Sequence, residues 1–194
     1  MIKLNEETVS FLPEKHFRAR VQQRFEELRR ELLTIVPDAD IEHVGSTAVP
    51  ESLTKGDLDV QVRIGELEYS AAKERLCQLY DVNVGGFATD DAISFQDYSS
   101  DPHVGIHLTV KGGSADIQHR FRDRLRLSES LRDDYDNLKR RFEGKSMSKY
   151  RDAKEKFVMH VFMEIPPHNK ANQSQPSAAG RSLCSRRCLR RYVA

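Results

Sequence analysis

The chain has 194 residues, of which 38% are hydrophobic and 31% are charged, so it suits one domain with a modest core and a charged surface. It has no apolar run long enough to span a membrane and no secretion signal at its start, which predicts a cytoplasmic protein. Its 3 cysteines have neither the even number of a disulfide framework nor the spacing of a zinc site.

Basic side chains are concentrated at the carboxyl end. Segment 166–194 carries six basic residues and no acidic one, which leaves residues 1–165 with 25 basic against 30 acidic side chains, about −5. A domain with that balance is not expected to bind duplex DNA. The basic tail could attract RNA, although an extension without function is the more ordinary interpretation.

Helices and strands alternate in the amino-terminal half. A helix should begin near Pro13, because proline suits a first helical position, and end before Pro37. Strands are predicted over 41–44 and over 58–63, the second from its period-two alternation, and a helix is predicted over 66–80. The apolar positions of these helices are Phe17, Val21, Phe25, Leu28 and Leu32 in the first, and Leu67, Ala71, Leu76 and Leu79 in the second, with Cys77 as a buried thiol.

The carboxyl-terminal half changes from strands to helices. Strands are expected over 92–97 and 104–110, after which apolar spacing predicts three helices up to Ile165. Pro166 closes the domain, and segment 166–194 has too few apolar side chains to offset its ordering entropy, so we expect it to be disordered. The sequence thus predicts one α+β domain over residues 1–165.

A possible phosphate- and metal-binding pattern follows the first strand. Gly45 lets the backbone approach a ligand closely, and the hydroxyl and amide donors of Ser46 and Thr47 suit phosphate oxygens. Asp57 and Asp59 are two residues apart, so they project from one strand face, where they repel unless a cation such as Mg²⁺ joins them. Nucleotidyl transfer requires such a cradle and metal, although each fragment alone is more often a turn or a solvated strand edge.

Several side chains near this pattern could balance phosphate charge. His43 could contact phosphate or metal, or be satisfied by backbone at a strand edge, and Lys55 could neutralise a triphosphate or lie in solvent. Arg122 with Asp123 could form a structural ion pair. Basic helix residues could line the nucleotide side of a cleft, although charged helix faces are usually only solvated: Arg122, Arg124, Arg126, Lys139, Arg140 and Arg141.

The sequence resembles the GrpB family over about residues 10–165. Segment 41–50 (IEHVGSTAVP), with Lys55 and the Asp59 strand, carries the more specific part of the resemblance. Further parts of the sequence resemble the helical half of the family: the segments 121–126 and 150–154, and the residues Tyr135, Leu138 and Lys139. The resemblance implies the nucleotidyltransferase superfamily related to DNA polymerase beta. It also implies a mixed β-sheet flanked by helices, a carboxyl-terminal helical half, and a site at the edge of the sheet.

The chain departs from the superfamily pattern, which has two acids after Gly-Ser and a third acid on a neighbouring strand. The resemblance places the GrpB aspartate on Asp59 and its alternate-position partner on Gln61, so Asp57 is an additional acid. No clear third carboxylate follows: His107 resembles a histidine of the family or is a core histidine, and Asp97 is the nearest acid alternative. A base that activates the attacking hydroxyl is then missing.

Two functional interpretations remain open. The first is a Mg²⁺-dependent nucleotidyltransferase that binds an NTP and transfers a nucleotidyl group to an unknown acceptor, with Asp57 and Asp59 as the catalytic and metal-binding residues. The second is a catalytically inactive module of the same fold that binds a nucleotide or a partner. In the nucleotidyltransferase interpretation, the residues that bind phosphate would be His43, Gly45, Ser46, Thr47 and Lys55.

Overall fold

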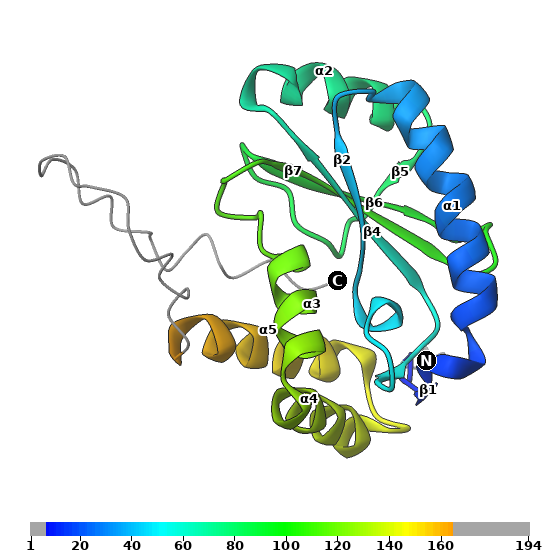
Figure 1. The fold of residues 1–194 in the computed structure, drawn as a ribbon, viewed down its shortest axis with the longest axis vertical. Helices are drawn as coiled ribbons and strands as arrows, with labels where there is room; N and C mark the ends of the chain where they lie inside the picture. Colours follow the sequence, from blue (N-terminus) through cyan, green and yellow to red (C-terminus); the bar gives the residue numbers. More distant parts are fainter. Residues whose placement is uncertain (1–6, 165–194) are drawn as a thin grey trace, which may run out of the picture.

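A mixed five-stranded sheet forms the centre of the structure, a computed structural model that describes residues 7–164 (Figure 1). The strand order is β2-β4-β7-β6-β5, in which β4 and β7 are parallel and the other neighbours are antiparallel. The predicted strands agree with the observed ones to within one residue at each end, and the α+β class is confirmed. The strands are β2 Asp40–Val44, β4 Leu58–Ile64, β5 Asp81–Val82, β6 Ala92–Asp97 and β7 Val104–Val110.

The main hydrophobic core lies between one face of this sheet and two helices, α1 (Arg18–Ile35) and α2 (Glu66–Cys77). Alternate side chains of β4, including Val60 and Val62, are fully buried there against Leu28 and other residues of the helices. Because side chains alternate along a strand, the residues between these valines point to the opposite face of the sheet. That opposite face is therefore available for polar residues.

Two details of these helices differ from the sequence-based expectation. Strand β1 (Leu12–Pro13) pairs with β3 (Leu53–Thr54), so its proline is extended and the 3-10 helix η1 (Glu14–His16) separates it from α1. In α2, Leu67 is 93% exposed and Cys77 is exposed, so only Leu76 of the predicted apolar stripe is buried and the predicted buried thiol is wrong. The helix buries a face with spacings of three and four, formed by Tyr69, Ala72 and Leu76.

Three helices make up the carboxyl-terminal half: α3 (Gln118–Leu127), α4 (Glu129–Phe142) and α5 (Met147–Glu164). Helix α3 lies against β2 and α4, and α4 lies against α5 (Figure 1). The Ser128 hydroxyl accepts a hydrogen bond from the Leu131 amide at 3.2 Å and so caps α4. The aromatic residues that join the three helices are Phe121, Tyr135 and Phe157.

The first described residues are hydrogen-bonded to the loop between α4 and α5. The Val9 amide donates to the Lys145 carbonyl and the Gly144 amide donates to the Val9 carbonyl, both at 2.9 Å. The Met147 amide donates to the Glu7 carbonyl at 2.8 Å. These bonds, which we call the terminal clip, fasten the start of α5 to the beginning of the domain.

The remaining expectations concern the ends of the chain and the membrane. Within residues 7–164 no helix combines the length and apolar character that crossing a membrane would require. The segment 166–194, for which we predict disorder, lies outside the described residues. The predicted domain boundary at residue 165 therefore remains a prediction.

Candidate active site

The face of the sheet opposite α1 and α2 carries the candidate site. Asp59 and Gln61 both point to this face of β4, as their spacing of two predicts. The strand register places Gly105 of β7 beside Asp59 and Gln96 of β6 beside Gly105. One row of side-chain positions, Asp59–Gly105–Gln96, therefore crosses three strands at the end of the sheet where β4 and β7 begin.

Two glycines allow the Asp59 carboxylate to lie directly against the backbone. A Cβ at Gly45 would be 2.2 Å from Asp59 Oδ2, and a Cβ at Gly105 would be 3.0 Å from Asp59 Oδ1. Gly45 also has φ 72° and ψ −172°, a conformation that is almost restricted to glycine. The glycine of the Gly-Ser pair is thus required by both its conformation and the position of Asp59.

Positive and polar groups surround the Asp59 carboxylate, whose side chain is 24% exposed. His107 Nε2 lies 3.7 Å from Asp59 Oδ1, and Ser94 Oγ holds the other ring nitrogen of His107 at 3.1 Å. Burial alone would raise the pKa of the Asp59 carboxyl, but the nearby His107 ring lowers it. The charges of Lys154 and Lys55 act in the same direction, so the pKa lies below its usual value and Asp59 is ionised at neutral pH.

Asp57 precedes β4 rather than lying on it, yet it reaches the same space as Asp59. Its carboxylate pairs with Lys55 at 2.6 Å. Both aspartates, Lys55 and Ser46 line a cavity of about 40 Å³ that Arg151 and other α5 residues close. The structure therefore brings Ser46, Asp57 and Asp59 together, as the spacing of the two motifs predicts.

Asp59 lies where three cavities meet, and among the described residues only its side chain lines all three. The second, of about 50 Å³, lies under α3 and α5 and is lined by Ser46, His107 and Lys154 among others. The third, of about 260 Å³, opens toward β6 and the loop before β7. A ligand group at Asp59 could therefore extend in more than one direction.

His43 and Thr47 are braced against each other and line none of these cavities. Thr47 Oγ1 donates to the Asp57 carbonyl at 2.9 Å and lies 3.1 Å from His43 Nε2, from which it can accept. The His43 ring stacks on Phe25. Burial lowers the pKa of His43 to about 4, so this histidine is neutral and holds the loop that carries Ser46.

The depressed pKa of His43 predicts how its removal changes acid stability. In the unfolded chain His43 binds a proton as the pH falls below its pKa of about 6.5, whereas in the folded chain it stays neutral down to about pH 4. Stability is therefore lost as pH falls through this window, by about 2 to 3 kcal/mol. His43→Gln should reduce the fall in unfolding free energy between pH 6.5 and 4, measured by urea denaturation. Parallel pH profiles of wild type and variant would contradict this.

Gln61, which stands where the superfamily pattern has an acid, is fully buried and used in structural hydrogen bonds. Its amide nitrogen donates to Thr109 Oγ1 at 3.0 Å and Asp116 Oδ1 at 3.1 Å, and its oxygen accepts from the His119 amide at 3.0 Å. Asp97, the last residue of β6, accepts hydrogen bonds from Ser99 and from the next residue, Ser100. Glu7 lines the larger cavity together with both aspartates, but residues 7–164 contain no cluster of three metal-binding side chains.

Comparison with known proteins identifies the family of this chain. The family model described as GrpB protein matches residues 15–164, which is most of the sequence. The chain belongs to the GrpB family. The resemblance found in segment 41–50 is thereby confirmed.

Relatives of this GrpB protein extend over most of the chain. The UPF0157 protein VC_A0354 of Vibrio cholerae is 26% identical over 155 residues, 80% of this chain and 82% of the relative. The crystal structure of the conserved protein GrpB from Enterococcus faecalis covers 78% of this chain and 96% of its own, with a TM-score of 0.60 at 18% identity. A partial overlap, at TM-score 0.39 and 17% identity, occurs with MgGTP-bound Cid1 poly(U) polymerase over 61% of this chain and 39% of that one. The fold is therefore that of GrpB, whose name states no activity.

The site of this GrpB protein includes residues that sequence reasoning did not assign to it. Arg151 and Lys154 of α5 line cavities with Asp59, and Tyr135 of α4 lines a cavity together with Ser46 and Asp59. Burial lowers the pKa of Lys154 to about 8, against the opposing effect of Asp59. The sequence signals for them were the resemblance of the stretch 150–154 and of Tyr135 to the family.

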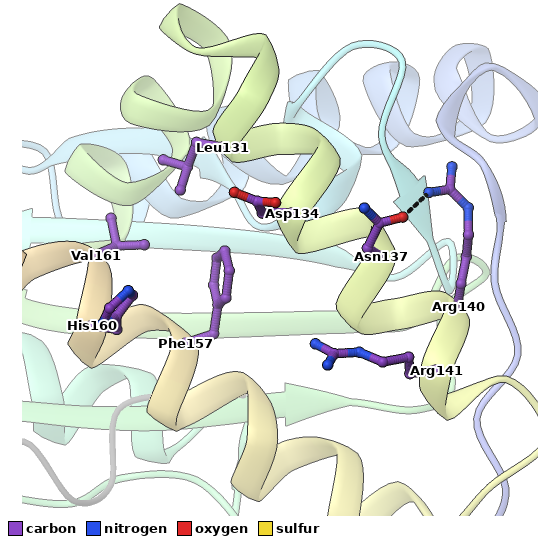
Figure 2. A pocket seen from close by; sticks show the side chains of 8 residues that line it. All are labelled: Leu131, Asp134, Asn137, Arg140, Arg141, Phe157, His160 and Val161. Carbon is purple, nitrogen blue, oxygen red and sulfur yellow. Dashed lines mark hydrogen bonds between the residues drawn. The ribbon is translucent and has the colours of Figure 1, made fainter.

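The basic residues of α3 and α4 do not line the cavities around Asp59. Arg122 pairs with Glu42 at 2.8 Å and with Asp123, which confirms the structural ion pair, and Arg126 binds the Ala48 carbonyl. Lys139 is fully buried. Arg140 and Arg141 border a separate hollow of about 800 Å³ between α4 and α5 (Figure 2), so the alternative in which the basic helix residues line the nucleotide side of a cleft does not apply at Asp59. That hollow is lined by Leu131, Asp134, Asn137, Arg140, Arg141, Phe157, His160 and Val161.

Proposed function

We propose that this GrpB protein binds a nucleoside triphosphate with Mg²⁺ and transfers the nucleotidyl group to an acceptor. The observation that carries the proposal is the single cavity lined by Ser46, Asp57, Asp59, Arg151 and Lys154. A hydroxyl donor, two carboxylates and two cations are the groups that a metal-bound polyphosphate requires. Ser46 and Lys154 distinguish this cavity from the larger one toward β6, which shares Asp57, Asp59 and Arg151 with it.

Each of these residues has a role in the proposal. The Ser46 hydroxyl, beside Tyr135 in the cavity under α3 and α5, binds a phosphate oxygen, and the conformation of Gly45 lets the backbone approach it closely. Lys154 and Arg151 neutralise the triphosphate from α5. His43 and Thr47, which we predicted to bind phosphate, instead position the loop.

The donor set fits a magnesium ion that arrives with its nucleotide. Mg²⁺ prefers hard oxygen ligands and is commonly held by one or two carboxylates together with substrate phosphates and water. Asp57 and Asp59 supply two such carboxylates, and the depressed pKa of Asp59 keeps it ionised. Bound Mg²⁺ would neutralise charge on the phosphates. Each aspartate already has a cation nearby, so we expect weak binding of Mg²⁺ alone.

In the proposed reaction an acceptor oxygen forms a bond to the α-phosphorus while the bond to pyrophosphate breaks. The chain contributes mainly position and charge. Ser46, Arg151 and Lys154 hold the phosphates, and the apolar side chains of Phe11 and Met147 exclude water from the cavity.

A second candidate function, nucleotide binding without turnover, is favoured by one observation. Gln61 occupies the position of a further acid and is committed to Thr109 and Asp116, so no carboxylate is available there to accept the proton of an acceptor hydroxyl. The fold and the binding residues are the same in both candidates. Release of pyrophosphate distinguishes them.

The proposal is tested by thermal unfolding of the full chain with each NTP, with and without Mg²⁺. A ligand at 100 times its Kd stabilises the folded state by about 2.7 kcal/mol, which raises the melting temperature by several degrees. Lys154→Met should abolish most of this shift, whereas Lys156→Met on the exposed side of α5 should retain it. The absence of any Mg²⁺-dependent shift would contradict the proposal, and a shift without pyrophosphate release would favour the second candidate.

A further inference from the structure

The largest cavity beside Asp59, of about 260 Å³, is lined by a glycine and by the polar side chains on either side of it. Asp59, Gly105 and Gln96 form one row across β4, β7 and β6. Because Gly105 has no side chain, the Asp59 carboxylate leans over its backbone, and Asp59 Oδ1 lies 3.0 Å from where a Cβ would be. The Gly105 backbone and these two polar side chains form the floor of the cavity.

Amide groups with hydrogen-bonding capacity line this floor. The Gln96 side-chain oxygen is buried and has no hydrogen-bond partner among residues 7–164. Asn83 also lines the cavity, and its side-chain oxygen accepts from the Gly85 amide at 3.0 Å, which orients its NH₂ group. A buried carbonyl without a partner costs stability, and a ligand donor that reached it from the cavity would remove that cost.

An aromatic surface lies at the rim of the same cavity. Tyr98 follows β6, is 62% exposed, and contacts the His103 ring edge to face at 5.3 Å between centroids. Both residues line the cavity. An edge-to-face contact covers at most one face of a ring, so at least one face of Tyr98 is free of His103, and an exposed aromatic ring beside hydrogen-bonding amides is suited to stack a planar heterocycle.

We propose that this cavity binds a nucleobase, stacked on Tyr98 with its polar edge at Gln96 and Asn83. The proposal rests on the proposed function, because the cavity leads to Asp57, Asp59, Lys55 and Arg151, where phosphate would lie. Its volume suits a ring-sized group rather than a whole macromolecule. The base belongs either to the donor NTP or to a nucleoside acceptor.

Calorimetric titration of the full chain separates these two sources. The probes are ATP, CTP, GTP and UTP with Mg²⁺, inorganic tripolyphosphate with Mg²⁺, and the four nucleosides with and without the NTP. The variants are Gln96→Leu and Tyr98→Ala, and Gln22→Leu on the exposed face of α1 is the matched control. Gln96→Leu should not lower the melting temperature, because it removes an unpaired polar group.

If the base is that of the donor, an NTP binds wild type at least tenfold more tightly than tripolyphosphate. Both cavity variants then bind the NTP at least tenfold more weakly than wild type does, and their affinity for tripolyphosphate is unchanged. If the base is that of an acceptor, the cavity variants bind a nucleoside at least tenfold more weakly than wild type does, and their affinity for the NTP is unchanged. Unchanged affinities for NTP and nucleosides in both variants would overturn the base site.

The failure of the base site and the failure of the proposed function give different results. Suppose that Asp59→Asn abolishes binding of NTP and tripolyphosphate, while the cavity variants leave both affinities unchanged. The proposed function would then stand and the base site would not. Nucleoside binding that depends on Gln96, without any binding of NTP or tripolyphosphate, would preserve the base site alone. If no probe binds the wild type, both are wrong.

Discussion

Asp59→Asn should abolish the Mg²⁺-dependent stabilisation by NTP and lower binding by a hundredfold or more. The change removes a carboxylate ligand and a charge that Mg²⁺ cannot replace with an amide. At an NTP concentration that stabilises the wild type by about 2.7 kcal/mol, the variant should show almost no shift in melting temperature. Thermal unfolding with and without NTP and Mg²⁺ measures this, and Asp133→Asn on the exposed side of α4 is the control.

The ligand-free Asp59→Asn protein should also be less stable than the wild type. The sequence alone suggests that neutralising one of two nearby carboxylates relieves repulsion. In the structure Asp57 pairs with Lys55, while Asp59 lies near His107 and the positive charge of Lys154. Asparagine leaves that charge without its counterion, so we expect a loss of about 1 to 2 kcal/mol. A variant that binds NTP and Mg²⁺ normally would end the metal-binding interpretation of Asp59.

Asp136→Ala should destabilise the protein by about 3 to 5 kcal/mol, because it leaves a buried lysine unpaired. Lys139 is fully buried, and Asp136 Oδ1 lies 3.0 Å from its Nζ. The same carboxylate accepts from the Ser52 hydroxyl at 2.8 Å and the Leu53 amide, so it joins α4 to the segment before β3. Burial lowers the pKa of Lys139 to about 8, against the pull of Asp136. Urea denaturation at pH 7 measures the loss.

A double variant separates a lost ion pair from an unpaired charge. Asp136→Leu with Lys139→Met removes both charges and fills similar volume, so we expect it to be more stable than Asp136→Ala. A double variant as unstable as the single one would mean that the hydrogen bonds to Ser52 and Leu53 dominate instead. Nucleotide binding serves as a second readout, because Asp136 lies outside the cavities around Asp59.

The strands of this fold are predictable because their burial follows a local pattern. Segment 58–63 alternates with period two, and its buried positions face the core while Asp59 and Gln61 face the site. Strand β5 (Asp81–Val82) has only two residues and carries no such pattern. The stripe of α2 is misread because Leu67 is apolar but exposed, and apolar identity alone does not fix which side of a helix is buried.

The candidate site is predictable only in its local part. Ser46 and Asp59 lie 13 residues apart on adjoining elements, so their spacing indicates that they meet. Arg151 and Lys154 reach the same cavity from the last helix, and a charged residue on a helix resembles a solvated one until its packing is known. The role of Gln61 depends on a hydrogen bond to His119, 58 residues away, which no local pattern contains.

The terminal clip has a consequence for the order in which the protein is made. Strand β4, which carries Asp59, is synthesised early, but Arg151 and Lys154 follow only in α5. The terminal clip, in which Val9 bonds to Lys145, can form only when synthesis has reached the start of that helix. A growing chain that ends before α5 therefore has both aspartates at an open end of the sheet, without the cations of α5. The site closes only when the first described residues meet the segment that leads into α5, so under the proposed function a ribosome-bound fragment lacks Arg151 and Lys154 for binding phosphate.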